Sequence, residues 1–343
     1  MDQLLPRPSE NDDNGIYDFS APPQHALEDA ETLLIHKIAS SKAFKRLEDV
    51  RFLGALDYCL IPNPNGMPSN ARYSRAQHSV GVAALARTYL HHTSHSMSDR
   101  LLCVASAMLH DIGHSPLSHT LEPVFVERFG ANHHTATNDI ILGKKLSEEI
   151  PVILRDFGIS PSWVIDILEG DDNRFEGFFS GPINFDTIEG IMRSRSYLKM
   201  QSLGLTPTKI VIAATLRSGD FSKDVVDNFW KCKDEMYNLI IRSRLGVIFD
   251  TMFQEVARNI PCFSQDDFFL TESTLFKKYP VLRAATQKAN WESIIQALPD
   301  QTPFQIRKFY VDEEGDFFRW EDKARYKQQK FASTLTLKGA LPM

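Results

Sequence analysis

The sequence predicts an all-α protein with a small α+β region at its C-terminal end. Apolar residues recur at helical spacing from about residue 28 to about residue 258. Serine, proline and glycine stand where such helices would begin and end. After residue 260 the pattern changes to strand-like alternation. Because 43% of the 343 residues are hydrophobic, the chain can bury a sizeable core.

The chain divides into three predicted parts. Residues 1–27 are rich in Pro, Asn, Asp and Ser, which is typical of a flexible arm. Residues 28–258 form the helical domain, and residues 259–343 form the α+β appendage with a basic tail. The N-terminal residues have no apolar core of signal-peptide length, and no apolar run approaches the length of a membrane span. We therefore expect no membrane contact.

The first helices are separated by clear breaks. Residues 28–56 carry apolar side chains at helical spacing, whereas the prolines and the glycine of residues 61–74 predict a loop. Residues 78–91 predict a helix with one broad apolar face. Ser98 is the expected cap of the next helix, which runs into His110.

The later elements are predicted in the same way. Pro161 marks a helix start, because proline is favoured in the first turn. Asp186 begins a short helix, and residues 223–258 make one long helical run. Residues 304–320 alternate around an Asp-Glu-Glu-Gly turn and predict a hairpin, after which residues 323–330 form the basic tail.

Charge and cysteine usage argue against several classes of protein. The net charge of -6 gives no general indication of binding to nucleic acid or to an anionic membrane. The four cysteines are scattered and include no CxxC pair, which argues against a disulfide framework and against a thiolate zinc site. A reducing, cytoplasmic setting is therefore expected.

Histidines are concentrated in one part of the chain, with their densest group in the string HDIGHSPLSH of residues 110–119. His110 and His114 are four residues apart, so they would share one face of a helix, and Asp111 is adjacent. An apolar helix that runs into such a polar cluster is costly unless partners or a metal satisfy the polar groups. We therefore favour a metal site over a solvated surface pair. Nitrogen and oxygen ligands together suit Fe, Mn, Zn, Co or Ni better than Ca or Mg.

Three strings extend this pattern, namely RYSRAQHSVGVA, HDIGHSPLSHTLE and INFDTIEGIMRSR. Together they resemble the HD-domain phosphohydrolase superfamily, and in particular its branch of deoxynucleoside triphosphate triphosphohydrolases of the SAM-and-HD-domain type. The resemblance runs from about residue 33 to about residue 258. It implies an HD-domain helical bundle, a nucleotide substrate and assembly into homo-oligomers.

The resemblance also implies a role for each matching residue. Four residues would ligate one divalent transition metal, with Mg as an option alongside the substrate: His78, His110, Asp111 and Asp186. Three histidines would surround the phosphate, one of them as general acid, with His133 as the alternative to the last: His114, His119 and His134. Three cations would bind phosphate oxygens: Arg75, Lys233 and Arg244. Glu189, one helical turn after Asp186, is either a partner that orients a histidine or a surface carboxylate.

The resemblance is weaker around the sugar and the base. Phe52 stands where the relatives have a glutamine that helps to read the sugar, and Gly190 and Ile241 stand where they have tyrosines. A buried hydroxyl without a partner is disfavoured, so such replacements change selectivity. Hydrolysis of a phosphate ester is therefore a firmer expectation than the choice of a deoxynucleoside triphosphate.

The leading hypothesis is a metal-dependent phosphohydrolase that acts on nucleotides like a deoxynucleoside triphosphate triphosphohydrolase, with water attacking phosphorus. Its metal would lower the pKa of the water and polarise a phosphoryl oxygen. A nucleotide phosphatase, or a phosphodiesterase on cyclic or modified nucleotides, remains an alternative. A catalytically weak module that binds nucleotides or nucleic acid is another, suggested by the basic tail and by Arg72 and Arg75.

Overall fold

The computed structural model describes residues 30–59, 72–200, 204–216, 219–315, 317 and 325–337. Within these residues helices predominate, and the two strands form one antiparallel hairpin, so the predicted fold class is confirmed. The predicted arm, and most of the predicted loop of residues 61–74, lie outside the described residues. No helix in these ranges combines the length and the apolar character that crossing a membrane requires.

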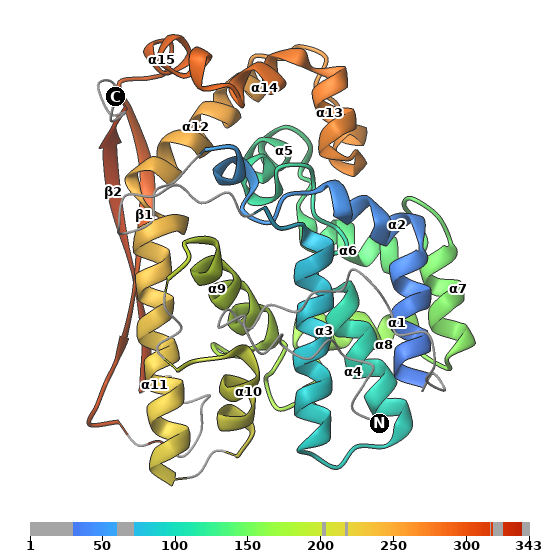
Figure 1. Ribbon diagram of the computed structural model, residues 1–343. Helices are drawn as coiled ribbons and strands as arrows, with labels where there is room; N and C mark the ends of the chain where they lie inside the picture. The colour runs from blue at the N-terminus through green and yellow to red at the C-terminus, as the bar shows by residue number, and fades with distance from the viewer. Residues whose placement is uncertain are drawn as a thin grey trace.

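Two long helices form the centre of the protein (Figure 1). Helix α3 (Arg75–His91) begins at a capping box made by Ser74 and Gln77, and α4 (Met97–Leu109) packs along it. Every residue of α4 from Leu101 onward is buried. The helix therefore ends inside the protein and delivers the next residues directly into the interior.

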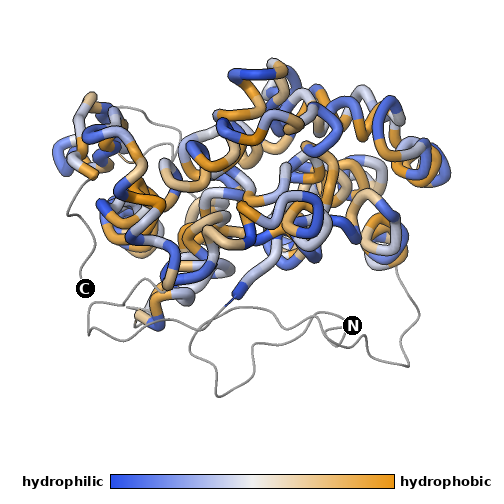
Figure 2. The backbone as a smooth tube through the Cα atoms, turned by 90° about the horizontal axis from the view of Figure 1, so that it is seen from above, coloured by the Kyte–Doolittle hydropathy of each residue, from blue (hydrophilic) through white to orange (hydrophobic). Residues whose placement is uncertain are grey.

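Shorter elements surround this pair. The segment before α3 consists of α1 (Ala30–Ser40), α2 (Lys42–Lys45) and two 3-10 turns, η1 (Arg46–Asp49) and η2 (Gly54–Tyr58). Seven elements follow α4: η3 (Ser118–Thr120), α5 (Glu122–Phe129), α6 (His133–Ile141), α7 (Glu149–Asp156), α8 (Pro161–Glu169), α9 (Phe185–Tyr197) and α10 (Pro207–Leu216). Figure 2 shows hydrophobic and hydrophilic stretches alternating along the helices, as expected when each helix buries one side.

The second half of the protein is built on α11 (Gly219–Met236). Helices α9 and α10 pack against both α3 and α11 and so join the two halves (Figure 1). After α11 come the π-turn η4 (Tyr237–Ile241), α12 (Arg244–Arg258), η5 (Gln265–Phe269), α13 (Glu272–Lys278), α14 (Pro280–Ala285) and α15 (Lys288–Gln296). Strands β1 (Gln301–Val311) and β2 (Tyr326–Thr336) complete the fold, and β1 packs along α11.

Two predicted helix boundaries are corrected. Ser96, not Ser98, caps α4, because its hydroxyl oxygen accepts a hydrogen bond from the backbone N–H of Asp99 at 3.2 Å. The run of residues 223–258 is not one helix, since η4 ends α11 and Ser243 caps α12. Both helices turn apolar sides to the same core, so the apolar spacing continues across a break that it cannot reveal.

The hairpin exists, but its second strand lies further along the chain than the sequence predicted. Strand β1 pairs with residues 326–336 instead of the residues directly after the Asp-Glu-Glu-Gly turn. Most of the predicted basic tail is therefore part of β2. The register depends on tertiary contacts, because Phe309 and Tyr326 both pack on Trp230 of α11, with ring centroids 5.5 and 5.4 Å away.

A buried ion pair fastens the hairpin to α11. The guanidinium of Arg325 donates to both carboxylate oxygens of Asp227, and the Tyr326 hydroxyl donates to one of them at 3.0 Å. Asp227→Ala leaves that guanidinium buried without its carboxylate, so we expect the free energy of unfolding to fall by about 3 kcal/mol. Urea denaturation checks this. The exposed Asp224→Ala on the same helix should change stability by less than about 0.5 kcal/mol, and an equal loss in both variants would contradict the prediction.

Candidate metal centre

The four predicted metal ligands converge from three parts of the chain. His78 lies on α3, His110 and Asp111 follow α4, and Asp186 lies in the first turn of α9. The Nε2 atoms of the two histidines are 3.2 Å apart. Asp111 Oδ2 lies 3.5 Å from each of them, and Asp186 Oδ1 lies 3.0 Å from His78 Nε2 and 3.9 Å from His110 Nε2.

Apart from the 3.9 Å between Asp186 Oδ1 and His110 Nε2, these spacings are those of donor atoms around a single ion. Bonds of about 2.0–2.2 Å at tetrahedral or octahedral angles place neighbouring donors about 3.0–3.5 Å apart. His110 Nδ1 lies 2.8 Å from the carbonyl oxygen of Ala107, which can only accept, so His110 Nε2 carries a lone pair. His110 Nε2 and the carboxylates of Asp111 and Asp186 all lie close to His78 Nε2. Burial lowers the pKa of His78, but the neighbouring carboxylates outweigh this effect and raise it to about 9. The raised pKa means that His78 holds a second proton, on Nε2, when no metal is bound. A divalent cation would take the place of this proton, so these residues fit a metal.

Glu189 orients His78 and is not a surface carboxylate. It is buried, and its Oε2 accepts a hydrogen bond from His78 Nδ1 at 2.5 Å, which leaves Nε2 directed at the ligand cluster. Arg193, one turn later, forms an ion pair with the same carboxylate. Gly81 on α3 makes room for this contact, because a Cβ there would lie 2.4 Å from Glu189 Oε1.

Arg75 is bound to the protein on all sides of its guanidinium. It donates to Asp111 Oδ2 at 2.6 Å, to Ser118 Oγ at 3.0 Å and to the carbonyl oxygen of Phe52 at 3.1 Å. Its side chain is buried and lies over the Phe52 ring. The structure therefore gives Arg75 the task of holding Asp111, and its expected contact with phosphate stays a prediction.

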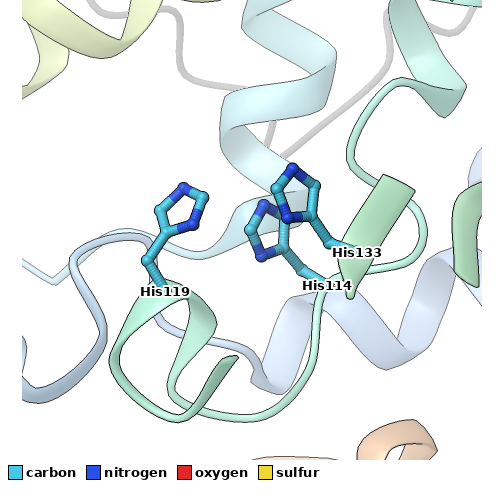
Figure 3. A group of neighbouring side chains, drawn as sticks. All are labelled: His114, His119 and His133. Atoms are coloured by element: carbon cyan, nitrogen blue, oxygen red, sulfur yellow. The ribbon is translucent and has the colours of Figure 1, made fainter. Parts of the chain in front are cut away.

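Three histidines form a second group beside the ligands (Figure 3). The rings of His114 and His133 stack with centroids 4.4 Å apart, and His119 faces His114 edge-on at 4.6 Å. Glu122 joins two of them, because its oxygens lie 2.5 Å from His133 Nδ1 and 3.1 Å from His119 Nδ1. The three rings thus form one cluster, in which Glu122 joins His119 to His133 and His114 packs against both rings.

His114 connects this cluster to the metal ligands. Its Nε2 lies 3.2 Å from Asp111 Oδ1, although neither ring nitrogen makes a well-directed hydrogen bond. Burial, together with the positive charge of Arg75, holds the pKa of His114 well below its usual range. The ring is therefore neutral at physiological pH.

His133 and His134 occupy different positions. His133, the alternative in the sequence prediction, is the one that stacks in the cluster, whereas His134 is exposed. Both line a cavity beside His110, Asp111 and Asp186, so the predicted role of His134 remains a prediction. The sequence analysis missed the partner Glu122, although it lies only three residues after His119; α5 separates it from His133.

Asp186 also lines a second cavity. It is lined by Arg75, His119 and Lys233 and by apolar side chains that include Phe52 and Ile241. Lys233 is buried there, with its Nζ 3.3 Å from the carbonyl oxygen of Pro182 and over the rings of Trp230 and Phe309. Arg244 lies exposed at the first residue of α12 and lines neither cavity, so its phosphate-binding role stays a prediction that this position does not favour.

Two residues that depart from the resemblance meet in this second cavity. Phe52 Cζ lies 3.4 Å from the point that a Cβ at Gly190 would occupy. The phenylalanine ring thus covers the space left by the glycine. Phe52 and Gly190, which both differ from the residues of the resembled family, therefore form one altered wall of the cavity.

Arg46 supports the site without any sequence signal. Its buried guanidinium donates to the carbonyl oxygens of Ile112 and His114 at 2.8 and 2.6 Å. These bonds hold the backbone that carries Asp111 and His114. The residue lies more than 60 positions earlier in the chain, so no local pattern predicts the contact.

Comparison with known proteins agrees with this geometry. The HD-domain family matches residues 75–161, the part that carries His78, His110, Asp111 and the second histidine group. The chain contains an HD domain. Its fold is similar to that of a solved phosphohydrolase of Bacteroides thetaiotaomicron, which superposes with a TM-score of 0.59 at 14% identity, covering 88% of this chain and 95% of that one. The resemblance inferred from the sequence motifs is confirmed.

Curated relatives match over shorter stretches. The chain is 29% identical to YwfO of Bacillus subtilis over 185 residues, which are 51% of this chain and 39% of that protein. It is 28% identical to the deoxynucleoside triphosphate triphosphohydrolase SAMHD1 of Gallus gallus over 173 residues, which are 47% of this chain and 26% of that protein. The matches thus span well under half of these relatives.

The contact between Glu189 and His78 predicts an effect on metal affinity. Glu189→Gln weakens the acceptor that orients His78, so we expect metal affinity to fall about 10–100-fold. Competition with a chelator, read by metal analysis, measures this. His110→Ala should lose the metal, while His91→Ala, exposed at the end of α3, should retain it. Unchanged affinity in Glu189→Gln would refute the assigned role.

Proposed function

We propose that the HD domain of this chain is a metal-dependent phosphohydrolase of nucleotides, most similar in action to a deoxynucleoside triphosphate triphosphohydrolase. The observation that supports the proposal is the convergence of His78, His110 and Asp111 at ligand spacing, with Asp186 3.0 Å from His78 and three further histidines beside them. A bound Fe, Mn, Zn, Co or Ni ion would lower the pKa of water and polarise a phosphoryl oxygen.

The histidine cluster supplies groups that hold and move protons. Glu122 accepts at Nδ1 of His119 and of His133, so the Nε2 atom of each ring is left for phosphate or for a leaving-group oxygen. His119 is 62% exposed in its side chain and lines the cavity that contains Lys233, where it could act as a general acid from its imidazolium form, with protons on both Nδ1 and Nε2. His114 is neutral and buried and lines neither cavity, so its predicted contact with phosphate stays a prediction that this position does not favour.

The two cavities suggest how a substrate would lie. Attack at phosphorus places the incoming and leaving oxygens on opposite sides. Asp186 lines both cavities, and the cations Arg75 and Lys233 line the one whose wall includes Phe52 and Ile241. We infer that the leaving part of the nucleotide lies in the cavity of Lys233, and that water reaches phosphorus from the cavity of His133 and His134.

A second function is favoured by the wall that Phe52 and Gly190 form. This wall offers a flat ring and no side-chain hydrogen-bond group. A nucleotide phosphatase, or a phosphodiesterase on cyclic or modified nucleotides, needs less recognition of the sugar and tolerates such a wall better. Nucleic-acid binding is not favoured, because the basic tail belongs largely to β2, where Lys327 forms an ion pair with Asp312. Homo-oligomer formation remains part of the proposal by similarity to the family.

Turnover over a panel of phosphate esters tests the proposal. Metal-loaded protein is incubated with deoxynucleoside and ribonucleoside triphosphates, monophosphates and cyclic nucleotides, each with Mn, Fe, Co, Ni, Zn or Mg. We expect turnover with at least one transition metal. Release of triphosphate supports the first function, whereas release of phosphate or opening of a cyclic diester supports the second. No turnover of any ester by loaded protein would contradict both.

Variants of His133 and His134 test which of the two histidines takes part in the reaction. His133→Ala breaks the stack with His114 and the contact to Glu122, so we expect kcat to fall about 100-fold. His134→Ala is the matched variant, and its smaller loss would assign the role to His133. The reverse order would restore the prediction made for His134.

Lys233 predicts a pH dependence of substrate binding. Burial lowers the pKa of Lys233 to about 8, so its ammonium attracts phosphate below pH 8 and loses its charge as the pH rises through 8. We expect KM to rise up to about tenfold per pH unit above 8. Lys233→Arg keeps its charge and should have a flat KM over the same range. The exposed Lys231→Arg is the control, and an equal rise in Lys233→Arg would refute the prediction.

A further inference from the structure

Glu272 is a buried carboxylate outside the region that matches the HD-domain family. It is the first residue of α13 and is 1% exposed. Its Oε1 accepts hydrogen bonds from the backbone N–H groups of Arg51 at 2.6 Å and Leu117 at 3.0 Å, and its Oε2 accepts one from the Tyr58 hydroxyl. Burial raises the pKa of Glu272 to about 7 despite these donors. Such a carboxylate is costly to bury, so its three contacts call for a reason.

The backbone that Glu272 binds has an unusual conformation. Leu117 and Ser118 have φ values of 59° and 48°, a region that residues other than glycine adopt only when surrounding contacts impose it. Glu272 binds the N–H of Leu117, and the Ser118 hydroxyl donates to the carbonyl oxygen of Arg51 at 2.6 Å. Gly54 allows the close approach, because a Cβ there would lie 2.4 Å from the Leu117 oxygen. Contacts from Glu272 and from the Arg51 carbonyl oxygen therefore hold Leu117 and Ser118 in this conformation.

This turn leads directly to the metal ligands and to the histidine cluster. Ser118 Oγ accepts from Arg75 Nε at 3.0 Å, and Arg75 donates to Asp111 at 2.6 Å. His119, the next residue, faces His114 and His133 with centroids 4.6 and 5.3 Å away (Figure 3). A shift of the turn would therefore move Arg75 and His119 together.

We propose that Glu272 is a positioning residue of the site: its carboxylate holds the turn of residues 115–118 so that Ser118 contacts Arg75 and His119 faces the histidine cluster. The catalytic consequence rests on the proposed function, whereas the geometric part does not. Glu272 lies 111 residues beyond the end of the matched region, so the C-terminal region supplies part of the working site.

Glu272→Ala and Tyr58→Phe form a matched pair for testing this role in the full-length, metal-loaded protein. Both remove a hydrogen bond of Glu272, but only Glu272→Ala frees the N–H groups of Arg51 and Leu117. We expect hydrogen exchange of residues 51–54 and 115–120 to quicken at least about tenfold in Glu272→Ala and to stay within about twofold of wild type in Tyr58→Phe. Unchanged exchange in Glu272→Ala, or equal acceleration in both variants, overturns the proposal.

Kinetics test the catalytic part with bis(p-nitrophenyl) phosphate and Mn²⁺ as the probe. We expect kcat of Glu272→Ala to fall about 10–100-fold with KM within about threefold of wild type. Glu272→Gln keeps an oxygen for both N–H groups and should recover most of the loss, while Tyr58→Phe should resemble wild type. A kcat loss of the same size in Tyr58→Phe, or no recovery in Glu272→Gln, overturns the role.

Two further outcomes remain distinguishable. If wild-type protein hydrolyses no ester in the panel, the proposed function fails, and hydrogen exchange alone decides whether Glu272 holds the turn. If Glu272→Ala does not fold, Ser118→Ala cuts the same link to Arg75 and keeps the hydrogen bonds of Glu272 to the N–H groups of Arg51 and Leu117. Its kcat should fall about tenfold, and wild-type kcat in that variant overturns the proposal.

Discussion

The carboxylate of Asp111 is the interaction on which the rest of the site depends. Its Oδ2 faces the Nε2 atoms of His78 and His110, and its Oδ1 lies beside His114. Arg75 neutralises part of its charge inside the protein, where an uncompensated carboxylate would be costly. His78, His110, Asp111 and Asp186 would hold a divalent ion here, and its positive charge would complete this balance. Asp111 thus links three groups electrostatically: the metal ligands, the histidine cluster and Arg75.

Rigid helices make that arrangement possible. Helix α4 is buried to its last turn, so its end presents His110 and Asp111 to the ends of α3 and α9 without a mobile loop between them. Capping by Asn184 starts α9 at the place where Asp186 faces His78. The partners of the ligands are equally well supported, since Glu189 reaches His78 across a glycine of α3. Ligands and partners placed on packed helices need little reorganisation when an ion binds.

The substrate side is built differently. Its cavity has cations at the end near Asp186 and an apolar wall elsewhere, part of it formed where Phe52 covers Gly190. In the proposed function, charge would attract the phosphate, whereas shape and apolar contact would decide which leaving group fits. The segments that carry Phe52 and His119 are tied to α13 through Glu272. The region that differs most in pattern from the HD domain is therefore joined to its substrate pocket, which links the end of the chain to the chemistry proposed for its centre.

The sequence by itself determined the helical fold class and the residues able to bind a metal, because apolar periodicity and ligand chemistry are local properties of the chain. The sequence left two roles open for Glu189, an orienting partner or a surface carboxylate. It also left open whether His133 or His134 lies beside the phosphate. Only the tertiary structure decided that Glu189 faces His78, that His133 stacks on His114, and that Arg244 lies outside both cavities. The break after α11 and the register of the hairpin were likewise decided by packing against the core. Each of these outcomes depends on contacts between distant segments, and a one-dimensional pattern does not record which faces of two helices meet.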